Sequence, residues 1–142
     1  TTRILLKNHN NQFLLTKRNK QPLIGMWGFI SGKIQDIDNR IIDSAQREIY
    51  EKTNLNIKSL DHIGDYYAKI LSENEVISNT LSHVFTVQIP KQISVIIPTS
   101  ESQNWFSYEK MVALSIMPDT LDLIYLSSHS DGKFFAELEY EI

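Results

Sequence analysis

Residues 25–55 read GMWGFISGKIQDIDNRIIDSAQREIYEKTNL, and this stretch decides the fold. Its second half, residues 40–53, has neither glycine nor proline, the two residues that weaken helices most. Four apolar side chains recur there at helical spacing and are expected to face the core: Ile41, Ile42, Ala45 and Ile49. Asp38 or Asn39 can cap the start of this helix, and Asn54 can close it because asparagine tolerates the left-handed conformation. The residues therefore predict one amphipathic helix.

Runs typical of β-strands lie on both sides of this helix. Residues 3–7 and 13–17 flank the turn-rich segment 8–11, which indicates a hairpin, and residues 23–30 form a third apolar run. Further strands are expected at 56–61, 63–71, 81–89 and 105–106. Short helices are expected at 108–114 and 119–126. The tail, residues 132–142, alternates apolar and acidic residues like a strand, although a helix remains open.

The length and the order of these elements indicate one domain over residues 1–142. With 42% hydrophobic residues, the chain has enough apolar material to build a core. Strands surround a central helix, and another helix lies near the end of the chain. This order is typical of an α/β (α+β) sandwich.

The charge balance and the absence of cysteine exclude several functions. The formal net charge is −3 and the 14 basic residues are scattered, so we expect no nucleic-acid polymer and no anionic membrane surface as partner. Without cysteine there is no disulfide, no thiolate zinc site and no thiol nucleophile. Apolar runs such as 23–30 and 93–97 are far shorter than the roughly 20 residues of a membrane span. We expect a soluble, cytoplasmic protein.

Two glutamates mark the face of the helix that carries chemistry. Glu48 and Glu51 are three residues apart, so their carboxylates lie about 60° from each other on the helical wheel. Like charges so placed repel by a few tenths of a kcal/mol, about the size of a surface pair interaction. A divalent cation between them removes that repulsion, and carboxylate oxygens suit Mg²⁺ or Mn²⁺. The alternative is an ordinary solvated helix face.

The surroundings of this pair favour the functional interpretation. Residues 25–55 resemble the Nudix box, G-x5-E-x7-R-E-U-x-E-E-x-G-U with U aliphatic, after a lead-in like W-x-F-x-x-G-K. The matching residues are Trp27, Phe29, Gly32, Lys33, Ala45, Arg47, Glu48, Ile49, Glu51 and Leu55. An LLTKR strand at 14–18 and the segment ESQNWFSYEKMVAL at 101–114 extend the resemblance to most of the chain, up to about Leu126.

This resemblance implies a Nudix-type α/β/α sandwich with a central mixed sheet, and a site that uses Mg²⁺ or Mn²⁺. Glu48 would be a metal ligand and Glu51 a second acid of the cluster. Ser31 would offer its backbone carbonyl, and Gly32 would allow close packing at the turn into the helix. Arg47 would orient the acids, since a guanidinium holds a carboxylate in fixed geometry, and it can also pair with Glu51 one turn later.

The loop before the helix departs from the family pattern. Between Gly32 and Arg47 there are 14 residues, whereas the pattern has 13, so one residue is inserted, and we place it in the loop 35–39. The acid expected before the helix is then supplied by Asp38 or by nothing. Asn39 occupies that place if the insertion lies earlier.

Lys52 stands where the second glutamate of the E-E pair belongs. Related enzymes use that glutamate as a metal ligand, and an ammonium group cannot coordinate a cation. Lys52 lies about 40° from Glu48 on the wheel, so it does not point away from the site. Either it pairs with Glu48 or with a substrate phosphate and replaces one of several metals, or the site binds metal weakly and turns over slowly or not at all.

Residues outside the helix complete the candidate site. Glu101 resembles the distant acid that binds metal or activates water in relatives, although it also fits an ordinary surface glutamate. Lys33 and Lys52 are candidates to contact substrate phosphates. Trp27 and Phe85 are candidates to stack on a base, although aromatic residues at such positions are more often core.

Two functions follow from the resemblance. The first is metal-dependent hydrolysis of a diphosphate bond in a nucleoside diphosphate derivative or a nucleoside triphosphate, with a small nucleotide-like molecule as substrate and a homodimer as a possible assembly. The alternative is a catalytically impaired module that binds a nucleotide or a protein partner, and Lys52 motivates it.

Overall fold

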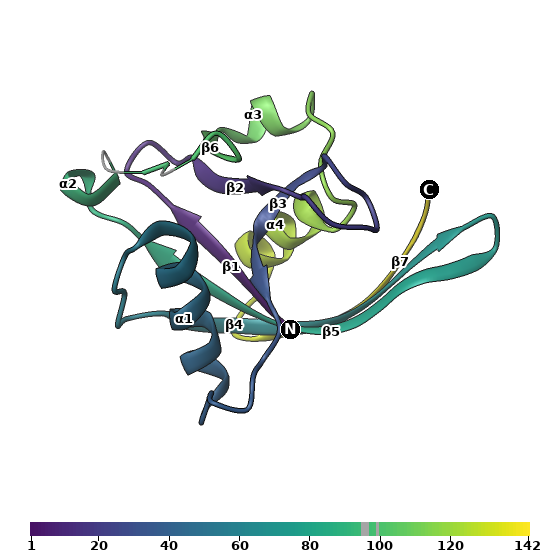
Figure 1. Cartoon of the computed structure of the whole chain (residues 1–142), viewed down its shortest axis with the longest axis horizontal. Helices are drawn as coiled ribbons and strands as arrows, with labels where there is room; N and C mark the ends of the chain where they lie inside the picture. The colour runs from purple at the N-terminus through teal and green to yellow at the C-terminus, as the bar shows by residue number, and fades with distance from the viewer. Residues whose placement is uncertain (95–96, 99) are drawn as a thin grey trace.

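The computed structural model describes residues 1–94, 97–98 and 100–142, and a single mixed sheet organises them (Figure 1). The strands are β1 (Thr2–Lys7), β2 (Phe13–Lys17), β3 (Trp27–Gly32), β4 (Asp61–Ser72), β5 (Glu75–Gln88), β6 (Gln103–Phe106) and β7 (Phe134–Glu141). They lie in the order β6-β2-β3-β1-β5-β4-β7. β1 runs parallel to β5 and β4 runs parallel to β7, while the other neighbours are antiparallel.

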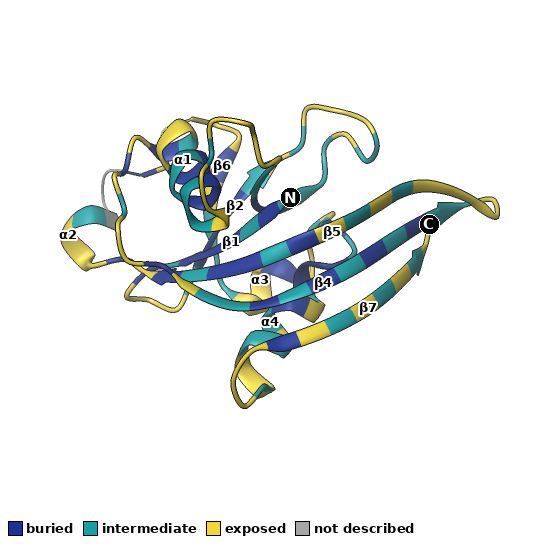
Figure 2. Cartoon of the chain, turned by 90° about the horizontal axis from the view of Figure 1, so that it is seen from below, coloured by how far each residue is buried: buried dark blue, intermediate teal, exposed yellow. Residues whose placement is uncertain are grey.

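Helices cover both faces of this sheet. They are α1 (Ile41–Thr53), α2 (Lys91–Ser94), α3 (Tyr108–Met111) and α4 (Thr120–His129). α1 packs on one face, and α3 and α4 lie on the other, which confirms the expected α/β/α sandwich (Figure 2). None of the helices among the described residues is both long and apolar enough to cross a bilayer.

Two hydrophobic clusters, one on each face, fix the helices to the sheet. The cluster under α1 contains Ile4, Leu6, Leu14, Ile30, Ala45, Ile49, Leu55, Leu60, Phe85, Val87, Ile89 and Ile97. The cluster under α3 and α4 contains Leu5, Phe13, Leu15, Phe29, Tyr66, Ala68, Val84, Met111, Leu123 and Phe134. Successive residues of β1 divide between the two clusters because side chains alternate across a strand.

The central helix lies where its apolar spacing predicts, but its start differs. Arg40 is the N-cap residue, and its backbone N–H donates to Asp43 Oδ2 at 2.9 Å, so neither Asp38 nor Asn39 caps α1. Ile41, expected in the core, is 37% exposed at the first position of the helix. Asn54 closes the helix as expected, with a left-handed φ of 62°.

The outer strands differ most from the sequence-based expectation. No strand covers residues 56–60; β4 begins at Asp61 instead and forms a long hairpin with β5 around a turn at Glu73. The open question about the tail is resolved as β7, an edge strand. Its alternate side chains point away from the cluster side, and the exposed set is Phe135, Glu137, Glu139 and Glu141. The apolar run 93–97 includes residues 95 and 96, which lie outside the described residues.

Removing the Ile49 side chain should loosen α1 from the sheet. Ile49 is fully buried, so Ile49→Ala is expected to lower the free energy of unfolding by about 2–5 kcal/mol, the cost of a large-to-small change in a core. Urea denaturation measures this. Tyr50→Ala, at the neighbouring position that is 56% exposed, is the matched control and should change stability by about 0.5 kcal/mol or less. Equal effects of the two substitutions would contradict the packing of α1.

Candidate functional site

The carboxylate of Glu48 is buried between two cations. Its residue is only 5% exposed. Arg47 Nη1 lies 3.1 Å from Glu48 Oε1, and Lys52 Nζ lies 2.8 Å from Glu48 Oε2. Burying a carboxylate without partners is strongly unfavourable, so these two contacts offset the cost of placing Glu48 inside the fold. Lys52 thus pairs with Glu48, one of the two partners that the sequence suggested for its ammonium group.

Arg47 connects the helix to the loop that precedes it. Its Nε and Nη2 donate to the two oxygens of Asp38 at 3.1 and 2.9 Å, and Nη2 also donates to the Lys33 carbonyl at 3.0 Å. Nη1 also lies 3.4 Å from Glu51 Oε1, which is the expected pairing one turn along the helix. The hydrogen bond with Arg47, and then the one from the Gln35 backbone, hold the pKa of Asp38 below its usual range. Asp38 in turn does most to raise the pKa of Arg47.

Asp38 supplies the acid that the family pattern expects before the helix. Five residues separate it from Gly32, which is the spacing of the motif, and its carboxylate holds Arg47. The additional residue therefore lies between Asp38 and the start of α1, and Asn39 does not occupy the acid position. The insertion lengthens the entry to the helix without changing the ion pair.

Gly32 is required by the position of Glu48. A Cβ built on Gly32 would lie 1.9 Å from Glu48 Oε1 and 2.0 Å from its carboxyl carbon, far inside contact distance. The end of β3 therefore lies directly against the carboxylate. Ser31, the preceding residue, lines both cavities of the cleft described next.

The acids open onto a cleft formed by two cavities of about 570 and 680 Å³. The cavities share several lining residues, among them Arg3, Glu51 and Lys52. The basic side chains that line the cleft are Arg3, Lys17, Arg18, Lys20, Lys33 and Lys52. The acidic ones are Glu48, Glu51 and Asp119. The lining is therefore cationic, although the protein as a whole carries a net charge of −3.

A buried polar group that the sequence did not reveal lies at the floor of the cleft. Arg3 Nε donates to the Tyr66 hydroxyl at 2.9 Å, and Tyr66 donates to Asp119 Oδ2 at 2.5 Å. Burial opposes the charge of Arg3, but Asp119 and Tyr66 outweigh it and raise the pKa of Arg3. Burial also raises the pKa of Tyr66. The sequence signal is a charged residue, Arg3, directly before the apolar run Ile4–Leu6.

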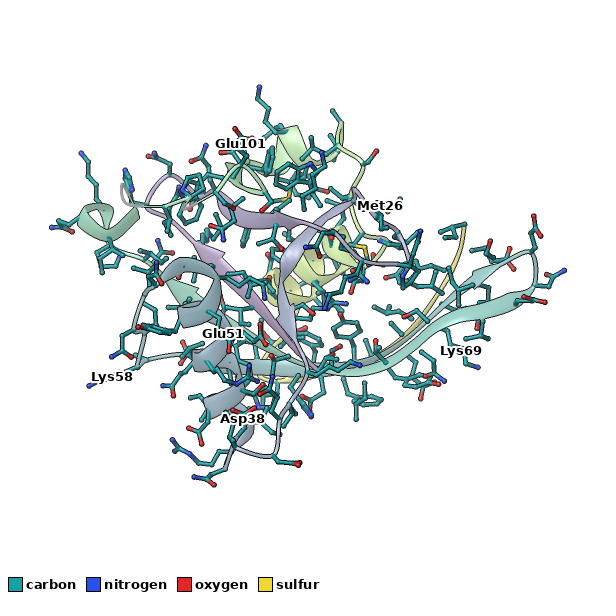
Figure 3. All side chains as sticks on the ribbon, in the orientation of Figure 1. Met26, Asp38, Glu51, Lys58, Lys69 and Glu101 are labelled. Carbon is teal, nitrogen blue, oxygen red and sulfur yellow. The ribbon has the colours of Figure 1, made fainter. Side chains whose placement is uncertain are left out.

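Three predicted site residues are not brought to this cleft. Phe85 is 2% exposed in the cluster under α1, and Trp27 packs edge-on against Phe106 with ring centroids 5.1 Å apart. Neither lines either cavity, so neither is placed to stack on a ligand there. Glu101 is exposed in the turn before β6, and Figure 3 shows it well separated from Asp38 and Glu51. Its neighbours Ser102 and Gln103 line the cleft instead.

Gln103 ties the cleft to α1. Its side-chain Nε2 donates to the Lys52 carbonyl at 2.5 Å, so β6 is held against the last turn of the helix. No feature of the sequence pointed to this contact, because the two residues are 51 positions apart.

The oxygen donors at the mouth of the cleft fit one hard divalent cation. Glu48 and Glu51 both contact Arg47 Nη1, which keeps the two carboxylates close together. Carboxylate oxygens are the ligands that Mg²⁺ and Mn²⁺ prefer. Lys52 Nζ, however, occupies a position on the second oxygen of Glu48 where a further cation would have to bind. The residues therefore suit a single ion rather than several.

Comparison with known proteins identifies the class of this fold. A family model described as the NUDIX domain matches residues 1–125, and the chain belongs to the Nudix family. A search of curated proteins finds no match.

Solved structures show the same fold at low sequence identity. The Nudix domain of Shewanella oneidensis NrtR, complexed with ADP ribose, superposes with a TM-score of 0.71 at 18% identity, covering 89% of this chain and 84% of that one. The Mutator MutT protein of Bacillus halodurans gives a TM-score of 0.69 at 20% identity, covering 99% and 88%. Shewanella oneidensis NrtR complexed with a 27mer DNA gives a TM-score of 0.74 at 18% identity, covering 89% of this chain and 58% of that one.

The contact between Gly32 and Glu48 predicts a strong coupling between these two positions. Gly32→Ala is expected to push the Glu48 carboxylate away from its cations and to lower the free energy of unfolding by about 1–3 kcal/mol, as overpacking does. In a Glu48→Ala background the added methyl group has room, so the same substitution should cost much less. A double-mutant cycle by urea denaturation measures the difference. Additive effects would mean that the two residues do not touch.

Proposed function

We propose that this protein binds a nucleoside diphosphate derivative in the cationic cleft and hydrolyses its diphosphate bond with one Mg²⁺ or Mn²⁺. The observation that carries this proposal is the position of Glu48 and Glu51 at the mouth of a cleft lined mainly by lysine and arginine. Such a lining attracts a polyanion, while the two acids attract a cation. A diphosphate with its metal satisfies both.

Known relatives support a nucleotide as the ligand. The NrtR Nudix domain is complexed with ADP ribose. A bifunctional NMN adenylyltransferase and ADP ribose pyrophosphatase of Francisella tularensis shares the fold with a TM-score of 0.60 at 17% identity, covering 88% of this chain and 39% of that one. ADP-ribose is therefore the first substrate to test, followed by nucleoside triphosphates.

Each group of the site has a role in this proposal. Glu48, Glu51 and the Ser31 carbonyl would hold the ion, which when bound neutralises the diphosphate and activates a water. Arg47 positions both acids through its hydrogen bonds, and Lys52 pairs with Glu48 and adds a positive charge to the lining of the cleft. The buried Arg3 offers a fixed guanidinium at the floor of the cleft.

A second function, nucleotide binding without turnover, is favoured by the contact between Lys52 and Glu48. The Lys52 ammonium group lies 2.8 Å from Glu48 Oε2, so the protein itself supplies a positive charge that balances this carboxylate. NrtR, which shares the fold, is known in complex with a 27mer DNA. A binding role for this chain would place the nucleotide in the same cleft and leave it intact.

Turnover measurements separate the two functions. ADP-ribose and nucleoside triphosphates are incubated with the protein and Mg²⁺. The products, AMP and ribose 5-phosphate or a nucleoside monophosphate and pyrophosphate, are separated and quantified by anion-exchange chromatography. We expect Mg²⁺-dependent turnover in the wild type and a loss of about 100-fold or more in Glu48→Gln, the size seen when a group that stabilises the transition state is removed.

The variant Lys52→Glu, which reverses the charge at this position, tests the second function. A wild type that binds nucleotide but turns over none, together with a Lys52→Glu variant that gains Mg²⁺-dependent activity, would replace the hydrolase proposal by the binding function. Lys58→Glu makes the same charge change on an exposed residue that does not line the cleft, and it should have no effect.

The cationic lining is tested by binding alone. Lys33→Met removes a charge from the cleft, and we expect the Kd for ADP-ribose, measured by calorimetry without metal, to rise about three- to tenfold, as for a charge-assisted contact. Lys58→Met is the matched control and should leave the Kd unchanged. If both variants bind like the wild type at low ionic strength, the diphosphate does not lie beside Lys33.

A further inference from the structure

Three potential metal ligands meet on β4 and β5, away from the cleft. Asp65 Oδ1 lies 2.7 Å from His62 Nε2 and 2.7 Å from His83 Nδ1. One ligand atom from each of the three residues lies within 4.8 Å of the other two. None of the three lines either cavity next to Glu48, so this His62–Asp65–His83 cluster is separate from the acidic site.

A β-bulge creates the cluster. Asp65 and His83 are direct cross-strand partners, and Phe85 is the partner of His62. His62 and Asp65 are three residues apart, so in a regular strand they would point to opposite faces. The register shift between His62 and Gly64 inserts one residue and turns His62 to the face of Asp65. Bulges of this kind commonly aim a side chain into a functional position.

The imidazole of His62 is held in place. Its ring stacks on Phe85 with centroids 5.0 Å apart and an interplanar angle of 26°. Its Nε2 also lies 3.1 Å from the Gly64 carbonyl, and its Nδ1 lies 3.3 Å from Lys133 Nζ. The three side chains of the cluster are half-buried, so an ion from solvent can reach them.

We propose that His62, Asp65 and His83 bind a first-row transition-metal cation of the Zn²⁺ class. Two imidazole nitrogens and one carboxylate oxygen are typical of such ions, whereas Mg²⁺ prefers an all-oxygen set. Ligand bonds of about 2.0–2.2 Å in tetrahedral geometry place ligand atoms about 3.3 Å apart. The present separations of 2.7 Å therefore have to open by less than 1 Å, within reach of side-chain rotation.

The Lys133 side chain competes with the binding of a metal ion at His62. A lysine ammonium only donates, so His62 Nδ1 accepts from it and the ring proton lies on Nε2, facing Asp65. Coordination through Nε2 moves that proton to Nδ1, which then faces the ammonium. Lys133 is exposed and has to turn away for the ion to bind. Its charge also repels the incoming cation.

The competing explanation is that the two histidines only donate hydrogen bonds to Asp65. Calorimetric titration of the whole chain with Zn²⁺, in excess Mg²⁺ to saturate hard carboxylate sites, distinguishes the two. We expect one Zn²⁺ per chain in the wild type and at least about tenfold weaker binding in Asp65→Asn and in His83→Gln. His129→Gln, a histidine on α4 outside the cluster, is the matched control and should bind like the wild type. Far-UV circular dichroism verifies that each variant is folded.

Two further measurements test the proposal. Lys133→Met should bind Zn²⁺ several-fold more tightly, because it removes the competing ammonium group. Co²⁺ bound to the wild type should show a visible ligand-field spectrum that Asp65→Asn loses. The proposal is overturned if Zn²⁺ binds no variant differently, if it does not bind the wild type, or if its binding is lost in Glu48→Gln instead.

Discussion

The buried carboxylate of Glu48 is the constraint on which the functional end of the molecule depends. It touches Gly32 at the end of β3, and its two oxygens contact Arg47 and Lys52. Through Arg47 it is linked to Asp38 and so to the loop before the helix. Removing either cation would leave the buried carboxylate with a single partner, which is more costly than losing a surface ion pair. The end of β3, the loop before α1 and α1 itself are therefore held together by contacts that centre on the Glu48 carboxylate.

Lys52 gives the Glu48 carboxylate a second cationic partner from the protein itself. Where the family pattern has a carboxylate, this chain has an ammonium group 2.8 Å from Glu48, so the balance of charge at the helix is already favourable in the protein alone. The cleft beside it is cationic, which favours an anionic ligand whether or not the ligand is cleaved. The residue that removes one carboxylate of the family pattern thus also adds a positive charge to the lining of the cleft.

The sequence predicted the features that depend on local spacing. The helix and the first hairpin follow from patterns within a few residues, and the sandwich followed from the order of the elements and the resemblance to the family. The pairing of Lys52 with Glu48 was one of the alternatives that the helical wheel allowed. It did not predict contacts between distant positions, such as Arg3 with Tyr66, which are 63 residues apart. It also missed the pairing of His62 with Asp65, because a bulge breaks the period of two on which strand predictions rest. The position of Glu101 also depends on the geometry of a turn that the sequence did not predict. This turn directs Ser102 and Gln103, and not Glu101, to the cleft.

The acidic pattern on β7 has a consequence for how the molecule behaves in concentrated solution. An edge strand offers free backbone groups with which another sheet can pair. Here Glu137, Glu139 and Glu141 place a row of like charges along that margin, so two molecules that approach edge to edge repel each other. The charges on β7 thus limit the growth of the sheet, because they oppose the addition of a strand from another molecule at this edge.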